Sequence, residues 1–248
     1  MTLGLAFRAA RLILGVAAAL CLTLALAPAR TLRLRASARA PAAVHGCLAF
    51  ALGLSVERRG AVNAGRAQLI VANHVSWLDI VALGALAPFT FVAKADLAAG
   101  PFARAALALQ GVVLIDRRRR FALPKAVAAI ADALRRGESV VLFAEGTTGD
   151  GNRMLPLKSS LFQGAVGFDV QPVLLDYCRS AGLAVSRRER PGIAWYGDMT
   201  FWPHFAALVR EGDVGCRVTF AAPLAWAGQG RKARALACEA TLRLVSRT

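Results

Sequence analysis

The chain has 248 residues, enough for one substantial domain with its own hydrophobic core, and a formal net charge of +16. Such a charge fits an anionic membrane surface, a nucleic acid or a phosphorylated substrate. Hydrophobic residues make up 56% of the chain, which is unusually apolar for a soluble nucleic-acid-binding protein. The composition therefore favours a membrane with anionic lipids as partner and predicts no nucleic-acid partner.

The first predicted element is residues 12–29, a run of 18 residues without a charge. As a helix it would be about 27 Å long, marginal for a bilayer core of about 30 Å. Arg8 and Arg11 before it, and Ala27-Pro28-Ala29 at its end, also fit a cleavable signal peptide. We favour an uncleaved anchor, because positive clusters tend to stay cytoplasmic and four arginines follow at once: Arg30, Arg33, Arg35 and Arg39.

A second apolar run, residues 42–54, is too short to cross a membrane and ends before the charged stretch at residues 57–59. It fits an amphipathic helix in the membrane interface and an ordinary core helix equally well. We therefore expect a membrane anchor with an amphipathic segment at residues 1–59 and one globular domain at residues 60–248.

After Gly60, short apolar runs alternate with helical stretches. Two amphipathic helices are expected, at residues 123–136 and 232–246, the second with Leu236, Leu242 and Leu244 facing inward. This alternation predicts an α/β fold with a mixed, largely parallel sheet flanked by helices. The expected strands are residues 68–72, 90–93, 111–115, 139–144, 170–175, 192–196 and 217–221.

Histidine and aspartate come directly after the first of these strands, in the segment Asn73-His74-Val75-Ser76-Trp77-Leu78-Asp79. Ser76 as N-cap and Asp79 three residues later would begin a helix between them, leaving His74 in the preceding loop within reach of Asp79. A carboxylate behind an imidazole suits general-base catalysis on a hydroxyl. A structural histidine held by a local aspartate is the alternative.

Three later segments carry further polar residues at strand ends. Residues 111–117 end in Asp116-Arg117 and continue into three more arginines. Residues 139–151 form a strand that opens into a glycine-rich loop, whose N–H groups are suited to a phosphate or an oxyanion. Residues 170–175 form another buried strand, Val-Gln-Pro-Val-Leu-Leu.

Together these segments read Asn-His-x4-Asp, Gly-x-x-x-Ile-Asp-Arg, Phe-x-Glu-Gly-Thr and a Pro-Val strand, in that order. The order resembles the four blocks of the glycerophospholipid acyltransferase family. The resemblance implies that His74 is the general base and that Asp79 orients it. It also implies that the acceptor is bound by Arg117 of the second block and by Glu145, Gly146 and Thr147 of the third, with Lys94 as a further basic position or a solvated lysine.

The third block departs from the family pattern, which usually continues Phe-Pro-Glu-Gly-Thr-Arg-Ser. Ala144 stands in place of the proline and Thr148 in place of the arginine, so we expect Arg153 and Lys158, which come soon after, to supply the missing charge. Residues 145–153 and 194–204 are more similar to the branch that acylates lyso-ornithine lipid. On this interpretation Asp150 or Asp198 pairs with the ornithine amine, whereas His204 is structural.

The resemblance implies direct acyl transfer from acyl-CoA or acyl carrier protein to the hydroxyl of a lysolipid. No cofactor is expected, and the enzyme would lie in the inner membrane with its catalytic domain facing the cytoplasm. Lyso-ornithine lipid is the favoured acceptor, and 1-acyl-sn-glycerol-3-phosphate is the alternative. A thioesterase with the same His-Asp pair and a non-catalytic anion-binding protein of the membrane surface are rivals from other classes.

The cysteines and histidines give no metal or disulfide pattern. The five cysteines are scattered without a C-x-x-C pair, and the three histidines include no H-x-x-x-H pair. We therefore predict no metal site and reduced, buried thiols at Cys21, Cys47, Cys178, Cys216 and Cys238.

Overall fold

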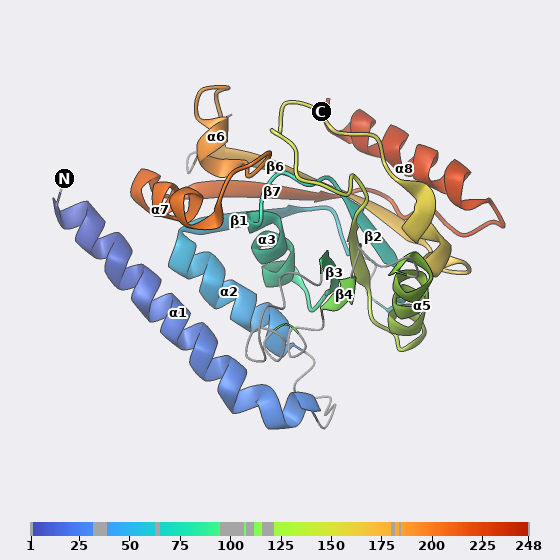
Figure 1. Ribbon diagram of the computed structural model, residues 1–248, viewed down its shortest axis with the longest axis horizontal. Helices are drawn as coiled ribbons and strands as arrows, with labels where there is room; N and C mark the ends of the chain where they lie inside the picture. Colours follow the sequence, from blue (N-terminus) through green and yellow to red (C-terminus); the bar gives the residue numbers. More distant parts are fainter. Residues whose placement is uncertain are drawn as a thin grey trace.

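The computed structural model describes residues 2–31, 39–62, 65–94, 107, 112–115, 122–179, 182–183 and 185–247. Within them, seven strands form one sheet in the order β1-β7-β6-β2-β5-β3-β4 (Figure 1). The strands are β1 (Leu54–Arg59), β2 (Leu69–Ala72), β3 (Thr90–Lys94), β4 (Val113–Ile115), β5 (Val140–Phe143), β6 (Val170–Arg179) and β7 (Val214–Phe220).

The middle of the sheet is parallel and deeply buried. β2 pairs in parallel with β5 and β6, and β3 pairs in parallel with β5 and β4. Every residue of β2 and β5 is buried, which explains why both read as continuous apolar runs rather than as alternating patterns. β7 is antiparallel to β6 and parallel to β1, so the predicted mixed, largely parallel sheet is confirmed.

Helices cover both faces of the sheet (Figure 1). One core contains side chains of α2 (Ala40–Leu52), α3 (Leu78–Leu86) and α7 (Phe201–Glu211). The other contains side chains of α5 (Ala122–Arg135), the 3-10 helix η3 (Ser159–Ala165) and α8 (Arg231–Val245). Alternate residues of β2 serve the two cores, since Ile70 belongs to the first and Leu69 to the second.

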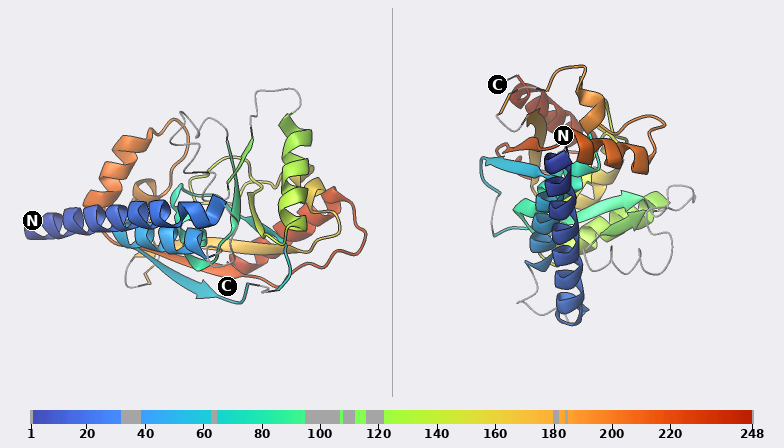
Figure 2. Two further views of the ribbon diagram at one scale, coloured as in Figure 1. Left: turned by 90° about the horizontal axis from the view of Figure 1, so that it is seen from below. Right: turned by 90° about the vertical axis from the view of Figure 1, so that its left-hand side faces the viewer.

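The N-terminal helix α1 (Thr2–Thr31) is longer than the charge-free run predicted it to be. Its segment Gly4–Ala29 is long and apolar enough to cross a membrane, by length and composition. α1 runs alongside α2 (Figure 2), and a Cβ atom added at Gly15 would lie only 2.5 Å from the Cβ of Ala51. Close packing with α2 therefore requires glycine at this position.

Two basic side chains attach the N-terminal half of α1 to the globular part of the chain. Arg11 Nη1 lies 2.6 Å from Asp213 Oδ1, and Arg8 donates a hydrogen bond to the carbonyl of Arg210. α2 in turn packs between α1 and α3 and buries seven of its residues, among them His45 and Leu52. Of the two interpretations of the second apolar run, this packing favours the core helix.

The strand expected at residues 192–196 is wrong. The short helix α6 (Arg190–Ile193) occupies its start, with Pro191 in the first turn, where a proline is tolerated. The N–H of Trp195 then donates to the carbonyl of Val75, 2.9 Å away, and so bonds to the loop after β2 instead of to a strand.

The sequence patterns also missed β1 and α7. β1 lies before the boundary expected at residue 60 and pairs with β7 at the edge of the sheet. Its charged residues Glu57, Arg58 and Arg59 are exposed there, and edge strands commonly carry charge.

The inward face expected for the last helix is wrong for two of its three leucines. Leu242 is fully buried, but Leu236 and Leu244 are 68% and 66% exposed. A buried arginine decides the rotation of α8: Arg234 donates to the carbonyls of Ala165 and Phe168 at 3.0 and 2.7 Å and stacks on the ring of Trp226. The buried residues are Arg234, Ala235, Cys238 and Leu242.

All five cysteines are free. Cys178, Cys216 and Cys238 are buried, as predicted, and Cys47 is partly buried. Cys21 is exposed on α1, contrary to the prediction, because α2 covers only one side of that helix.

Candidate active site

The loop at residues 73–77 follows β2 at the carboxyl end of the parallel strands, where open α/β sheets bind their ligands. β2 ends opposite Val173, whereas β6 continues for six residues beyond it. The side chain of Asn73 bridges this step, accepting from Leu175 N–H at 2.8 Å and donating to Leu175 C=O at 3.0 Å. The main chain just before His74 is thereby fixed to β6.

His74 and Asp79 lie together as the loop-and-helix spacing predicted. His74 Nδ1 is 2.8 Å from Asp79 Oδ2. The Asp79 side chain is 0% exposed and that of His74 is 18% exposed. Because a carboxylate only accepts hydrogen bonds, Nδ1 carries the hydrogen, and the lone pair of Nε2 is available to take a proton from another molecule.

The helix after this loop begins later than predicted. α3 starts at Leu78 with Trp77 at the N-cap, and Ser76 makes no side-chain cap. Asp79, in the first turn, instead reaches back to the loop, where its Oδ2 also accepts from the N–H groups of Val75 at 2.7 Å and Ser76 at 3.0 Å. One carboxylate oxygen therefore both shapes the loop and orients the imidazole.

Tyr177 is a site residue that the sequence patterns missed. Its hydroxyl donates to Asp79 Oδ1 at 2.6 Å, so both oxygens of the buried carboxylate are hydrogen-bonded. Burial, and then the nearby charge of Asp79, raise the pKa of Tyr177 well above its ordinary value, which keeps the hydroxyl protonated as a donor. The strand was expected to end at Leu175. Two more residues of strand would have placed Tyr177 on the same face of β6 as Leu175.

Residues at the end of β5 hold the other side of His74. The imidazole stacks on the ring of Phe143 with centroids 4.0 Å apart and planes 14° apart. Glu145 Oε1 accepts from the N–H of His74 at 3.1 Å, and Oε2 accepts from the N–H of Leu155 at 3.2 Å. Burial raises the pKa of Glu145. Glu145 thus connects the His74 loop to the loop after β5.

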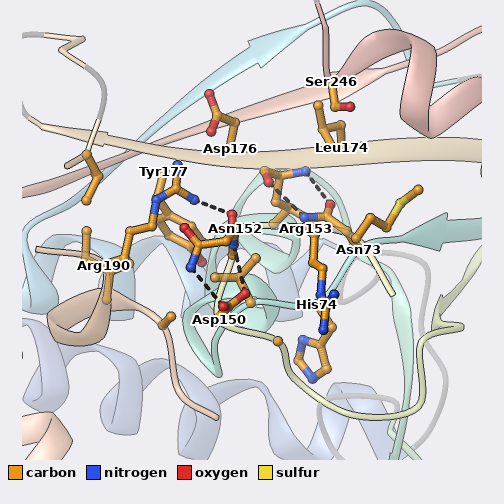
Figure 3. A pocket seen from close by; sticks show the side chains of 18 of the residues that line it. Asn73, His74, Asp150, Asn152, Arg153, Leu174, Asp176, Tyr177, Arg190 and Ser246 are labelled. Carbon is orange, nitrogen blue, oxygen red and sulfur yellow. Dashed lines mark hydrogen bonds between the residues drawn. The ribbon is translucent and has the colours of Figure 1, made fainter. Parts of the chain in front are cut away.

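A cavity of about 530 Å³ opens in front of this group (Figure 3). It follows the free edge of β6 and receives side chains from both faces of the sheet, with Leu174 and Asp176 on one face and Tyr177 on the other. Its lining is rich in charge. The charged lining residues are Arg59, Arg153, Arg190 and Arg217 with Glu145, Asp150 and Asp176.

One wall of the cavity is the loop at residues 149–153. It lies against the His74 loop, since Gly149 N–H donates to the carbonyl of His74 at 2.9 Å. Gly151 has φ +72°, and a Cβ there would lie 3.2 Å from a methyl group of Val75, so glycine suits both its backbone and its contact. Arg190 donates to the carbonyl of Gly151. Asp150 accepts from the N–H and side-chain amide of Asn152, which lowers its pKa.

Comparisons with known proteins show the family to which the chain belongs. Residues 54–175 match the family model described as Acyltransferase. The chain is 37% identical over 227 residues to the lyso-ornithine lipid O-acyltransferase of Brucella abortus, an alignment that covers 86% of this chain and 85% of that protein. The chain belongs to the acyltransferase family. It is an acyltransferase of lipid biosynthesis.

Other relatives of the acyltransferase carry two different names. A lyso-ornithine lipid O-acyltransferase of Rhizobium meliloti is 38% identical, over 81% of this chain and 69% of that protein. A 1-acyl-sn-glycerol-3-phosphate acyltransferase of Neisseria gonorrhoeae is 36% identical, over 60% of this chain and 58% of that protein. The crystal structure of the 1-acyl-sn-glycerophosphate acyltransferase of Thermotoga maritima has the same fold, with a TM-score of 0.62 and 21% identity over 97% of each chain.

The expected acceptor-binding residues of the acyltransferase are only partly brought together. Glu145 and Arg153 line the cavity, whereas Gly146 and the exposed Thr147 are absent from its lining. Gly146 has φ +76° in the turn after β5, and Lys158 lies close behind it. Arg117 lies outside the described residues, as does the side chain of Lys94 at the end of β3.

The two aspartates considered for the ornithine amine differ in position. Asp150 lines the cavity, whereas Asp198 is exposed and is not part of the described lining. His204 is buried on α7 and accepts a hydrogen bond from Trp77 Nε1 at 3.1 Å, an arrangement that fits the structural role predicted for it.

Proposed function

We propose that this acyltransferase moves a fatty acyl group from acyl-CoA or acyl carrier protein to the hydroxyl of a lysolipid, with lyso-ornithine lipid as the favoured acceptor. His74 acts as general base and Asp79 orients it. The main support is the hydrogen-bonded chain from Tyr177 through Asp79 to His74, which leaves Nε2 of the imidazole available beside the cavity.

In the proposed step, Nε2 of His74 takes the proton of the lysolipid hydroxyl as its oxygen attacks the thioester carbonyl. The new C–O ester bond forms, the C–S bond breaks, and the thiolate leaves with the proton returned by the imidazolium. Asp79 stabilises that imidazolium through Nδ1, and the Tyr177 hydroxyl donates a hydrogen bond to the second carboxylate oxygen. No covalent enzyme intermediate and no cofactor is needed.

The charges of the cavity support the lyso-ornithine acceptor. An N-acylated ornithine carries one carboxylate and one ammonium group, so it requires both signs of charge. Asp150 and Arg190 both line the cavity, and Arg190 donates to the carbonyl of Gly151, the residue after Asp150. Each charged group of the acceptor thus has a partner of opposite charge nearby. Arg153 is exposed at the cavity rim and adds positive charge for the carboxylate. Relatives named for this acceptor align over most of the chain, which gives independent support.

The alternative acceptor is 1-acyl-sn-glycerol-3-phosphate. Relatives of that name match a shorter part of the chain, but the arginines of the cavity would also suit a phosphate. The rival of another class, a non-catalytic anion-binding protein, requires neither the buried carboxylate behind His74 nor the cavity in front of it.

We further propose that α1 anchors the enzyme in the inner membrane and that the catalytic domain faces the cytoplasm. The apolar helix α1 and the basic residues around it support this arrangement. Several basic residues near anionic headgroups would each add about 1 kcal/mol of attraction.

The test is an acyl-transfer assay with the detergent-purified full chain. Labelled acyl carrier protein and acyl-CoA are offered with lyso-ornithine lipid and lysophosphatidic acid in parallel, beside His74→Ala and the near-isosteric His74→Gln. We expect acylation of lyso-ornithine lipid and a fall of roughly 10³-fold in both variants, because the base is lost.

Unchanged thermal unfolding of both variants would exclude loss of fold as the cause. Acylation of lysophosphatidic acid alone would select the alternative acceptor. Histidine-dependent release of free fatty acid without any acceptor would identify a thioesterase. Full activity of His74→Gln would reject the general base.

A further inference from the structure

An aromatic surface lies at the beginning of α7, away from the cavity lining. Trp202 is 73% exposed and Phe201 is 39% exposed. We call this surface the α7 tip, defined as Phe201, Trp202 and the partly buried Phe205 behind them. Their rings contact one another, with centroids 5.2 to 6.0 Å apart. Tryptophan with one face in the protein and one face exposed is typical of residues at the membrane interface.

The α7 tip is connected directly to the catalytic loop. The ring of Trp77, which stands between His74 and Asp79 in the sequence, lies 5.3 Å from Phe201 and 6.3 Å from Phe205. Its indole N–H donates to His204 Nδ1 at 3.1 Å, one turn further along α7. Because these side chains are closely packed, a displacement of the α7 tip would also displace the loop that carries His74.

The same helix is joined at its other end to α1. Arg8 donates to the carbonyl of Arg210 in the last turn of α7, and Arg11 pairs with Asp213 just beyond it. Helices α1 and α7 lie on the same side of the molecule, which faces the viewer in the right-hand view of Figure 2. Along α1, large apolar side chains are exposed, including Phe7 at 67% and Leu14 at 65%.

We propose that the α7 tip is a second membrane contact, in which Phe201 and Trp202 enter the interfacial region of the lipid bilayer on which α1 is anchored. The occupant is a bilayer surface because the tip is aromatic rather than aliphatic and is fixed to a helix apolar enough to cross a membrane. Through Trp77, the contact holds the His74 loop at the level of the headgroups, where the hydroxyl of a lysolipid lies.

Lipid contact is tested first by fluorescence quenching of the full chain in vesicles of phosphatidylcholine and phosphatidylglycerol. Part of the phosphatidylcholine carries bromine on its acyl chains, which quenches nearby tryptophans. We expect quenching in the wild type that is lost in large part in Trp202→Phe and retained in Leu244→Ala, an exposed apolar residue of α8. Equal quenching in the wild type and Trp202→Phe would overturn the proposal. This readout does not depend on the acceptor or on catalysis.

Coupling to the site is tested with Trp202→Ala. The activity on lysolipid embedded in vesicles is divided by the activity on a short-chain lysolipid dispersed in water. We expect this ratio to fall about tenfold, the effect of roughly 1.4 kcal/mol of lost interfacial burial. An unchanged ratio would overturn the coupling, as would the same fall in Leu244→Ala. Failure of acyl transfer by the wild type itself would count against the proposed function and not against the lipid contact.

Discussion

The segment at residues 73–79 and the loop at residues 149–153 lie against each other beside one cavity but are built differently. In the first, Asp79 is completely buried and both of its oxygens accept hydrogen bonds. In the second, Asp150 is only partly buried and Arg153 is exposed. The interior therefore fixes the groups proposed to move a proton, whereas the groups proposed to bind the headgroup are more exposed to solvent, where substitution costs less stability.

In the buried segment at residues 73–79, the largest effect is expected from Asp79→Asn. With its NH2 at the position of Oδ2 the amide would oppose the three donors of His74, Val75 and Ser76, and with its NH2 toward Tyr177 it would keep them but remove the negative charge that stabilises the imidazolium. We expect kcat to fall by about 10³-fold, with a smaller effect on KM. Steady-state acyl transfer measures both, and Asp132→Asn on the exposed face of α5 is the matched control. Near-wild-type kcat in Asp79→Asn would remove the orienting role.

Tyr177→Phe removes one hydrogen bond of Asp79 but keeps its negative charge, so a smaller effect is expected. The change leaves Asp79 Oδ1 buried without its donor, a loss of about 1.5–3 kcal/mol for a hydrogen bond to a charged group. We expect kcat to fall by roughly tenfold and the protein to unfold at a lower temperature. Tyr196→Phe, at a tyrosine outside the cavity lining, is the control. Equal kinetics for both variants would show that Tyr177 only fills space.

Among the cavity residues at and beside the loop 149–153, Asp150→Asn and Arg190→Gln should change the selectivity between acceptors more than kcat. We expect Asp150→Asn to lower kcat/KM for lyso-ornithine lipid by about tenfold while sparing lysophosphatidic acid, since only the former has an amine. Competition assays with both acceptors measure the ratio. Asp198→Asn is the control because Asp198 is exposed outside the described cavity lining. A selectivity change of equal size in Asp198→Asn would contradict the assignment.

The smallest effect is expected from Glu189→Gln, next to Arg190. Arg179, and then Ser186, lower the pKa of Glu189 to about 2. Its contribution to stability is thus fully present above its ordinary pKa of 4.5 and is lost as the pH falls through about 2. Chemical denaturation should find the variant slightly less stable than the wild type at pH 7, with the difference shrinking toward pH 2. A constant difference would exclude the ionised pair as its cause.

The parts of the fold that local patterns predicted are those in which burial follows a regular pattern along the chain, either continuous, as in β2 and β5, or on one face, as in α5. β2, β3, β5 and most of β6 are apolar runs of strand length, and α5 begins and ends within one residue of its predicted bounds. β1 was missed because an edge strand carries charges, and the face of α8 was wrong because Arg234 is buried by contacts with residues 165, 168 and 226. No local pattern contains such contacts.

For the site, the sequence by itself determined that His74 and Asp79 meet, because five residues across a loop and a first helical turn bring them within reach. It also contained the order of blocks that is typical of acyltransferases. Only the tertiary structure decided that Tyr177 completes the pair, that Glu145 holds the backbone of His74, and that Asp150 rather than Asp198 lines the cavity. The physical reason is separation along the chain. The Glu145 and Tyr177 contacts join residues 71 and 98 positions apart, and the place of Asp150 depends on how loops from different strands pack at the edge of β6. No spacing rule in the sequence reaches so far.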